Sequence, residues 1–440
     1  MNTPIYDFAR KYADSKHIRA HMPGHKGVSR LGFEGLDITE ISGADSLYDA
    51  SGIIKESEEN ASSLFGAHTF YSTEGSSLSV RAMLAIIARY SARDGRKPKI
   101  LAVRNAHKSF VYGASLLDLE VEWIYGESYL TCALDYDAIE KRVAEGKPDA
   151  LYITSPDYLG RVADIERIAE ICHKHGALLA VDNAHGAYLK FLTSSRHPID
   201  LGADLVCDSA HKTLPVLTGG GYLHISKGAP TELLTYARAS MELFGSTSPS
   251  YLILESLDLC NKELSSGYAE KISHYAEKIG KYIEKLNTGG YSLVSNEPFK
   301  ITVEAKKYGY YGQELGKSLE ERGIYPEFCD PDYLVLMLTP DNEEDIAKIT
   351  DALLSIPRKP EIKEAPPTPS LLESAINARE ALLSPSETAP VSNSAGRILA
   401  SASVGCPPAV PLAVLGERID ESTRDAFLYY GIDSISVVKE

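Results

Sequence analysis

Residues 150–188 read ALYITSPDYLGRVADIERIAEICHKHGALLAVDNAHGAY, and they carry the clearest sign of a fold in the chain. Two apolar runs, at 150–154 and 177–181, have the length and composition of buried strands. The stretch between them predicts an amphipathic helix that stops at Gly176, with an apolar face made of Ile165, Ile168, Ala169 and Cys172. These residues therefore predict a β-α-β unit.

The same alternation of short apolar runs and amphipathic stretches extends from about Gly52 to about Ser226. Further strand-like runs are ILAV at 100–103, ADLVC at 203–207 and YLHI at 222–225. This pattern is typical of a mainly parallel sheet covered by helices, so the predicted fold class is α/β. We assign this large domain to residues 52–241.

After about Glu242 the sequence changes to long helical segments rich in Lys and Glu. They are followed by strand-like FKITVEA and YLVLMLT, which flank a helical GQELGKSLEERG. A smaller α+β domain is therefore predicted for residues 242–357.

The remaining segments are predicted to connect or to end these domains. RKPEIKEAPPTPS at 358–370 and SPSETAPVSNS at 384–394 are rich in proline or polar residues, which is typical of linkers or surface connections. We therefore treat residues 358–394 as a linker region. Residues 1–51 form an N-terminal segment and residues 395–440 a C-terminal one.

The chain of 440 residues has 45 Lys and Arg against 61 Asp and Glu, a net charge of −16. This balance argues against a nucleic-acid or anionic-membrane surface and suits a cationic small molecule, although many proteins are acidic for solubility alone.

No apolar run is long enough to span a bilayer and no export signal is visible, so a soluble, cytoplasmic protein is expected. No C-x-x-C pair occurs, which disfavours a metal site or a disulfide framework for Cys132, Cys172, Cys207, Cys260, Cys329 and Cys406.

Lys212 lies in the stretch ADLVCDSAHKTLPVLTGGG, where a predicted strand ends and a tight turn of small residues follows. Its neighbours Ser209 and His211 offer a hydroxyl and an imidazole instead of carboxylates. A lysine in this setting is suited to form an imine with an aldehyde cofactor, because burial favours the neutral, nucleophilic amine. Taken alone, however, the pattern favours an ordinary solvated surface lysine.

Asp182 directly follows another apolar strand, and His185 lies three residues later. A carboxylate at this point either pairs with a pyridinium nitrogen or simply caps the following turn. Neighbouring strand ends that carry Asp182 and Lys212 meet the needs of one cofactor ring, and this co-occurrence favours the first interpretation.

Two further segments suit a phosphorylated, planar cofactor. Gly75, Ser76 and Ser77 precede an apolar-periodic helix, where backbone N–H groups and hydroxyls either hold a phosphate or only cap the helix. His107 follows the strand-like ILAV, where its ring either lies against the cofactor or has a structural role.

Together these motifs resemble the Orn/Lys/Arg decarboxylase family of fold-type-I pyridoxal-phosphate enzymes. The similar segments occur in the family's order: HMPGHKG at 21–27, DITEISGADSLYDASGIIKESEENASSLFGA, the Gly75 loop, NAHKS, TSPDYLG at 154–160, VDNAHGAY, SAHKTLPVLT and the C-terminal GRILA…CPPAVPLAVLGERI. The resemblance implies a fold-type-I, transferase-like large domain with a mainly parallel sheet and a smaller α+β C-terminal domain.

The resemblance also implies a role for each motif residue. Lys212 carries pyridoxal phosphate as an imine, Asp182 pairs with the pyridine nitrogen, and His107 stacks on the ring. His185 lies near the imine and the phenolic oxygen, so Lys212, His185 and His107 are the expected catalytic residues. The phosphate is held by the Gly75 loop together with Ser76, Ser77, Ser209 and His211.

Residues that contact the substrate are less sharply indicated. The resemblance places the N-terminal region, with His25 and Asp45, at the substrate entrance. Among the acidic residues of the small domain, Glu327, Asp330 and Asp332 either bind a cationic side chain or belong to a solvated turn.

Four positions depart from the family pattern. Asn183 replaces the usual acid, Tyr188 replaces a second histidine, Gly219 replaces a glutamine, and Cys406 replaces an aromatic residue. None of them removes the imine, ring or phosphate chemistry, but they leave the identity of the substrate open.

The resemblance implies decarboxylation of a basic amino acid to its amine and CO2, in polyamine-type metabolism. Arginine is favoured because the compact chain resembles the shorter bacterial arginine-decarboxylase-like members, while lysine and ornithine stay open. Transamination or aldol cleavage on the same cofactor, or a non-catalytic regulatory role, are the alternatives. At least a homodimer is expected, with the active site completed by the neighbouring subunit.

Overall fold

The computed structural model describes residues 1–15, 17–92, 95–126, 133–403 and 410–439. The chain folds as two compact units. The first comprises Met1–Pro98, Val143–Ser155 and Asp164–Ser273, and the second comprises Lys99–Arg142, Pro156–Ala163 and His274–Glu440. These units cut across the expected domain bounds, because residues 99–142 and 156–163 pack with the C-terminal part of the chain.

Five strands of the first unit lie side by side in the order β1 (His68–Ser72), β7 (Gly221–Ile225), β6 (Leu205–Asp208), β5 (Leu178–Asp182) and β4 (Ala150–Thr154). Strands β4, β5 and β6 run parallel, whereas β7 is antiparallel to both β6 and β1. Only β7 is therefore reversed, and the carboxyl ends of the other four strands point to one edge. Nearly every residue of these strands is buried, as expected for a sheet covered by helices.

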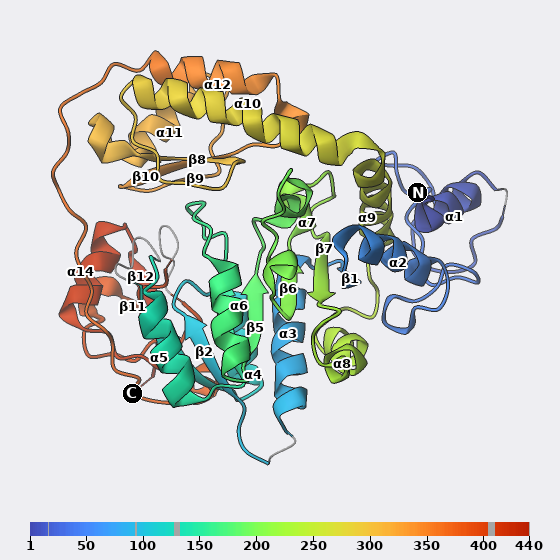
Figure 1. Ribbon diagram of the computed structural model, residues 1–440, viewed down its shortest axis with the longest axis horizontal. Coiled ribbons are helices and arrows are strands. Elements are labelled where there is room, and N and C mark those ends of the chain that lie inside the picture. The colour runs from blue at the N-terminus through green and yellow to red at the C-terminus, as the bar shows by residue number, and fades with distance from the viewer. Residues whose placement is uncertain (16, 93–94, 127–132, 404–409, 440) are drawn as a thin grey trace. The chain divides into compact units, whose positions relative to one another are not determined.

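Helix α3 (Gly75–Ser91) packs on β6 and β7, α6 (Ile165–Lys174) packs on β5, and α8 (Thr231–Glu242) packs on α3 (Figure 1). The predicted apolar face of α6 is buried in full, and Asp164 caps the helix through Arg167 N. Helices α1 (Pro4–Ala13), α2 (Ile53–Phe65) and α9 (Tyr251–Glu263) pack together. Short helices complete the unit at Leu47–Asp49, Ala187–Phe191, Pro198–Leu201, Ala210–Thr213 (α7) and Leu264–Tyr268.

The second unit contains a parallel pair, β2 (Lys99–Val103) and β3 (Glu120–Ile124), with α4 (Lys108–Leu116) between them in sequence. Its antiparallel three-stranded sheet has the order β8 (Lys300–Glu304), β10 (Tyr333–Met337) and β9 (Phe328–Cys329). The accompanying helices are α11 (Gly312–Glu320), α12 (Asp345–Leu354) and the short helices Ala305–Tyr308 and Pro340–Asn342. Helices α5 (Tyr136–Gly146) and α10 (Ala269–Thr288) each belong partly to both units.

The C-terminal part of the second unit has its own small core. Strands β11 (Ser386–Pro390) and β12 (Ser434–Val438) pair antiparallel, and α13 (Ala378–Leu383), α14 (Glu421–Tyr429) and the short helix Val391–Asn393 accompany them. Buried residues of this core include Val391, Leu399, Phe427 and Val437.

Two sequence expectations need correction. The predicted connection 384–394 is wrong for Ser386–Pro390, because pairing with β12 supplies backbone hydrogen bonds that its polar sequence does not reveal. The helical stretch that was expected around residues 263–286 is interrupted at Ser266 and Gly267, where Gly267 adopts a φ of +107°. Residues 358–370 form no helix or strand. Cys132 and Cys406 lie outside the described residues.

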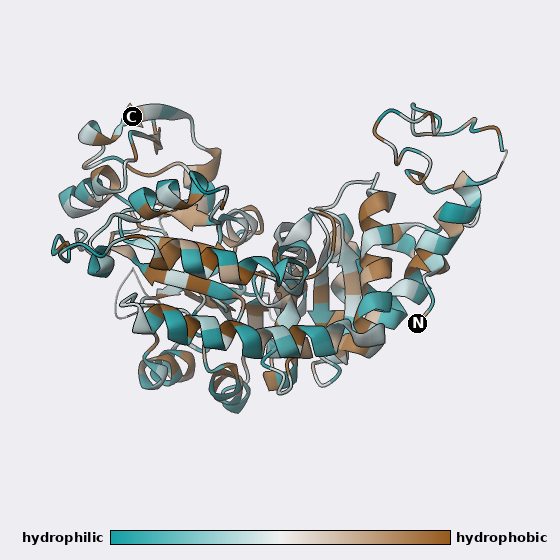
Figure 2. Ribbon diagram, turned by 90° about the horizontal axis from the view of Figure 1, so that it is seen from above, coloured by the Kyte–Doolittle hydropathy of each residue, from teal (hydrophilic) through white to brown (hydrophobic). Residues whose placement is uncertain are grey.

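Figure 2 shows hydrophilic and hydrophobic residues alternating along the long helices. Among the described residues, no helix combines the length and the apolarity needed to cross a bilayer.

Candidate active site

Lys212 and His185 meet at the carboxyl edge of the sheet in the first unit. Lys212 lies in α7, four residues after the end of β6, and His185 lies three residues after the end of β5. Lys212 Nζ is 3.0 Å from His185 Nε2. Because the carboxyl ends of parallel strands share one edge, residues 27 positions apart in sequence come within hydrogen-bonding distance.

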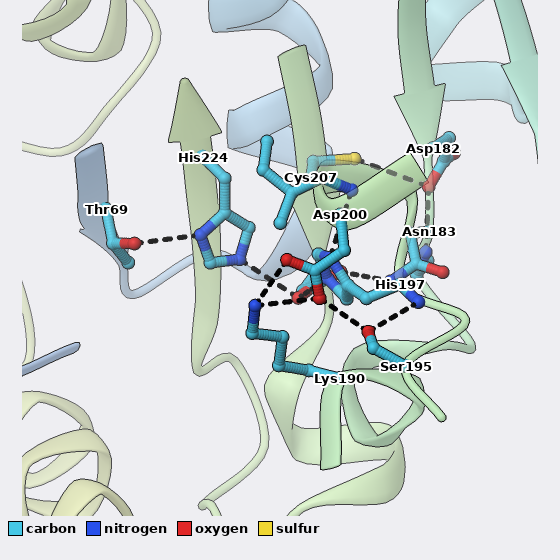
Figure 3. A network of polar contacts seen from close by, with 12 residues as sticks. Thr69, Asp182, Asn183, Lys190, Ser195, His197, Asp200, Cys207 and His224 are labelled. Carbon is cyan, nitrogen blue, oxygen red and sulfur yellow. Dashed lines mark hydrogen bonds and ion pairs between the residues drawn. The ribbon is translucent and has the colours of Figure 1, made fainter. Parts of the chain in front are cut away.

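Asp182, the last residue of β5, is buried and held by donors on both oxygens. Oδ1 accepts from Ala184 N at 3.1 Å and from Cys207 Sγ at 3.4 Å (Figure 3), and Oδ2 accepts from the Tyr152 hydroxyl at 3.1 Å. The carboxylate is thereby fixed in the same sheet edge from which Lys212 and His185 project.

The N-terminus of α3 is suited to hold an anion. Helix α3 begins at Gly75, and the side chain of its N-cap residue Glu74 makes no capping hydrogen bond. The N-terminus of a helix favours a negative group, because the helix dipole is positive there. Ser76 N donates to Ser209 Oγ at 3.2 Å, and the two hydroxyls are 2.8 Å apart. Ser77 follows in the first turn of the helix. Backbone groups and serine hydroxyls therefore meet at one helix N-terminus.

Glycines allow the start of α3 and the loop before β7 to approach each other closely. We call these two segments, together with Ser209 and His211, the phosphate cradle. Gly75 N donates to Gly219 O at 2.6 Å, and Gly219 has a φ of +100°. A Cβ on Gly221 would lie 2.7 Å from Asp208 O and 3.0 Å from Gly75 C. Glycine at 219 and 221 is thus required by the backbone, which gives a structural reason for the departure at Gly219.

His211 closes the cradle. Its Nδ1 donates to Gly220 O at 2.9 Å, and burial lowers the pKa of the imidazole. The ring is therefore neutral at neutral pH, and its Nε2 is an acceptor.

A buried polar network surrounds Asp208, the last residue of β6, and Figure 3 shows Asn183, His197 and His224 of this network. The carboxylate of Asp208 accepts from Asn183 Nδ2 at 2.6 Å and from Nε2 of His197 and His224, each at 3.0 Å. Burial alone would raise the pKa of Asp208, but the two histidines outweigh it and hold that pKa below its usual range. The neutral amide at the departure Asn183 is thus a donor to a neighbouring carboxylate.

The same three side chains, His197, Asp208 and His224, are close enough to be considered as metal ligands. Nδ1 of His197 accepts from Ile199 N, and Nδ1 of His224 bonds to the Thr69 hydroxyl. These bonds place the ring protons on Nε2, directed at Asp208, so the arrangement is that of a hydrogen-bond network.

His107, in the second unit, follows β2 as the sequence predicts and is the N-cap of α4. Its Nδ1 accepts from Ser109 N at 3.3 Å and lies 2.9 Å from Ser109 Oγ. A role for His107 toward the cofactor stays a prediction.

Three acidic residues of the small domain make contacts within the second unit. Glu327 Oε1 accepts from the Tyr158 hydroxyl at 3.2 Å. Asp330 is buried, which raises the pKa of its carboxyl to about 7, and its Oδ1 accepts from two backbone N–H groups. Asp332 pairs with Lys306 Nζ at 2.9 Å. Glu327 is the most exposed of the three.

His25 and Asp45 belong to the first unit and organise loops there. Asp45 accepts from backbone N–H groups at the start of α2, including Gly52 and Ile54, so it caps that helix. His25 Nε2 is 3.0 Å from Asp37 Oδ2. These contacts give both residues a structural role, and contact with a substrate stays a prediction.

The residues brought together in the first unit fit pyridoxal phosphate. Lys212 would supply an amine, Asp182 a fixed carboxylate for the ring nitrogen, and the α3 N-terminus with the Ser76 and Ser209 hydroxyls a phosphate site. Sequence reasoning missed Tyr152, Asp208, His197 and His224, since a tyrosine in an apolar run and two distant histidines give no local signal.

Residues 3–291 of this chain match the protein family described as "Orn/Lys/Arg decarboxylase, major domain". The arginine decarboxylase of Bacillus subtilis is 26% identical over 98% of this chain and 94% of its own length. The arginine decarboxylase of Halalkalibacterium halodurans is 28% identical over 96% of this chain and 91% of its own length.

Solved structures agree on the fold. Lysine decarboxylase A from Pseudomonas aeruginosa has a TM-score of 0.81 at 18% identity, covering 99% of this chain and 80% of that one. The Francisella novicida lysine decarboxylase has a TM-score of 0.79 at 18% identity, covering 99% and 81%. The predicted α/β, fold-type-I class is therefore confirmed.

Proposed function

Since this chain belongs to the Orn/Lys/Arg decarboxylase family, we propose that it removes the α-carboxyl group of arginine as CO2 and releases the corresponding amine, with pyridoxal phosphate as cofactor. Family membership makes it an amino-acid decarboxylase that acts on a basic amino acid. Arginine is favoured over lysine and ornithine because relatives named arginine decarboxylase match nearly the whole chain.

The observation that carries the proposal is the 3.0 Å approach of Lys212 Nζ to His185 Nε2 beside the buried Asp182. When bound, the cofactor supplies an electron-accepting ring that stabilises the charge left as CO2 departs. Lys212 would carry the cofactor through its amine and exchange it for the substrate's amine. Asp182 would hold the proton of the ring nitrogen.

The proton that replaces the carboxylate would come from Lys212 or from a histidine such as His185. Lys212 Nζ and His185 Nε2 lie 3.0 Å apart, which is close enough for a proton to pass between the two side chains. His185 is 5% exposed, which limits exchange of that proton with bulk water.

The phosphate would be held by backbone N–H groups of α3 with Ser76, Ser77, Ser209 and His211. A neutral His211 donates its one ring proton to Gly220 O, so it would line the phosphate site beside Ser209 without a competing carboxylate. For the cationic end of the substrate we propose Glu327, because Asp330 is buried and Asp332 already pairs with Lys306.

The test is to supply purified protein and pyridoxal phosphate with arginine, lysine or ornithine and to measure CO2 and amine together. Equal amounts of CO2 and amine, formed fastest from arginine, are expected. Faster turnover of lysine or ornithine would contradict the substrate assignment. A keto acid without CO2 would indicate transamination, and a protein without cofactor absorption would indicate a non-catalytic relative.

A further inference from the structure

Asp182 is held from both strands that flank β5. In the sheet register Thr154 of β4 and Cys207 of β6 lie opposite Asp182. The Cys207 thiol donates to Oδ1 from one side, and the Tyr152 hydroxyl donates to Oδ2 from the other. A thiol is a weak donor, whereas a phenol is a strong one, so Tyr152 is the main side-chain partner of this carboxylate.

The register explains how Tyr152 reaches Asp182. Tyr152 pairs with Ala180, two residues before the level of Asp182, and residues two apart on a strand point to the same face. Two residues span about 6.6 Å along a strand, which is close to the length of a tyrosine side chain. The small side chain of Ala180 leaves space for the ring, which is fully buried.

The direction of the hydrogen bond follows from burial and charge. Burial raises the pKa of Tyr152 well above its usual value, and the negative charge of Asp182 raises it further. The phenol therefore keeps its proton and donates it to Asp182 Oδ2.

We propose that Tyr152 is a positioning residue for Asp182: its hydroxyl fixes the carboxylate and draws off part of the negative charge, and so sets how firmly Asp182 holds the proton on the cofactor's ring nitrogen. This inference rests on the proposed function, because it requires pyridoxal phosphate beside Asp182. Without the hydroxyl, Oδ2 loses this donor while Oδ1 keeps Ala184 N and Cys207 Sγ, so the carboxylate is held less firmly and becomes more basic. A more basic carboxylate takes a larger share of the proton from the ring nitrogen.

The test is Tyr152→Phe, which keeps the ring and removes only the hydroxyl. Loss of one hydrogen bond to a charged group is expected to lower kcat about tenfold, with KM changed less than about twofold. In the resting enzyme loaded with ring-¹⁵N-labelled pyridoxal phosphate, the nitrogen signal is expected to move toward that of unprotonated pyridine. This second readout needs no turnover.

The matched control is Tyr291→Phe, which removes a buried hydroxyl that donates to Leu353 O at 2.6 Å. It is expected to lower thermal stability without moving the nitrogen signal. Cys207→Ala, which removes the weaker donor, is expected to move the signal in the same direction as Tyr152→Phe but by less.

Replacement of Tyr152 by 3-fluorotyrosine keeps the ring and its hydroxyl and makes the hydroxyl a stronger hydrogen-bond donor. This variant tests the role of Tyr152 even if the phenylalanine variant does not fold. A shift opposite to that of Cys207→Ala is expected. A nitrogen signal that stays at the wild-type position in the folded Tyr152 variants would overturn the inference while the proposed function stands. A wild-type protein that binds no pyridoxal phosphate would contradict the proposed function instead.

Discussion

A single substitution of Lys212 can separate its covalent role in the reaction from any contribution that it makes to the packing of the fold. Its side chain is only partly buried, so Lys212→Ala is expected to leave the fold intact, with a melting temperature within about 4 °C of wild type. Turnover and the visible absorption of bound cofactor are expected to disappear, because the amine acts through a covalent bond. Retained activity with unchanged absorption would contradict the assignment.

Lys190→Ala is the control for this experiment. Lys190 pairs with Asp200 at 2.5 Å in the same unit, so its loss removes a partly buried ammonium that has no proposed role in the chemistry. The control variant is expected to lose some stability and to keep its cofactor absorption.

At the scale of single residues, sequence reasoning depended on polar residues that lie within four positions of the end of an apolar strand. Lys212 and His185 were expected at one site, and the structure brings them within 3.0 Å. Tyr152 could not be found in this way, because nothing local distinguishes a tyrosine that packs from one that donates to Asp182. The contacts of Asp208 with His197 and His224 likewise could not be predicted, because only tertiary packing brings these residues together.

Among the helices and strands, periodicity predicted β4, α6 and β5 to within about two residues. The apolar runs at 150–154 and 177–181 are long enough to be recognised, and the structure has strands at Ala150–Thr154 and Leu178–Asp182. Strands β1 and β3 were not predicted, because HTFYS and EVEWI contain polar or charged residues and draw their stability from neighbouring strands.

Helix α9 carries a buried acid that makes stability depend on pH. Burial raises the pKa of Glu255 to about 8, and the charges of Asp37 and Asp258 add to the effect. Because the folded pKa lies above the ordinary value of 4.5, the stabilisation is full below pH 4.5 and is lost as pH rises through 8. The whole loss amounts to at most about 5 kcal/mol.

Glu255→Gln tests this dependence, because the amide has a similar shape and does not ionise. The free energy of unfolding in urea is expected to fall less steeply between pH 5 and pH 8.5 in the variant than in wild type. Equal slopes in the two proteins would show that Glu255 does not ionise in this range.

The contact among β6, β7 and the start of α3 depends on Gly221. A methyl group there would lie 2.7 Å from Asp208 O, and this atom belongs to rigid backbone. Gly221→Ala is therefore expected to displace the phosphate cradle and to weaken pyridoxal-phosphate binding at least about tenfold, measured by titration of the apoprotein. Gly228→Ala is a suitable control, since a Cβ there meets only Ser226 Oγ at 3.7 Å. Equal affinities in the two variants would contradict this account of the cradle.

For the whole molecule, the N-terminal segment bears on assembly. The stretch around His25 carries several exposed apolar side chains, namely Ile18, Met22, Val28, Leu31 and Phe33. Exposed apolar residues close together in the chain are typical of surfaces that are covered in an oligomer. Together with the glycine-rich HMPGHKG motif, they support the proposal of a homodimer in which this segment helps to complete the partner's active site.

Subunit mixing tests this proposal directly. Lys212→Ala and His25→Ala are each expected to be inactive, the second because a shared entrance is lost. After dissociation and random reassociation, half of the dimers contain one chain of each kind, and each such dimer has one site with neither substitution. Recovery of about one quarter of the wild-type activity is therefore expected, measured as CO2 release. If each site is built within one chain, both kinds of site stay defective and no activity returns. A fully active monomer by sedimentation would rule out the shared site altogether.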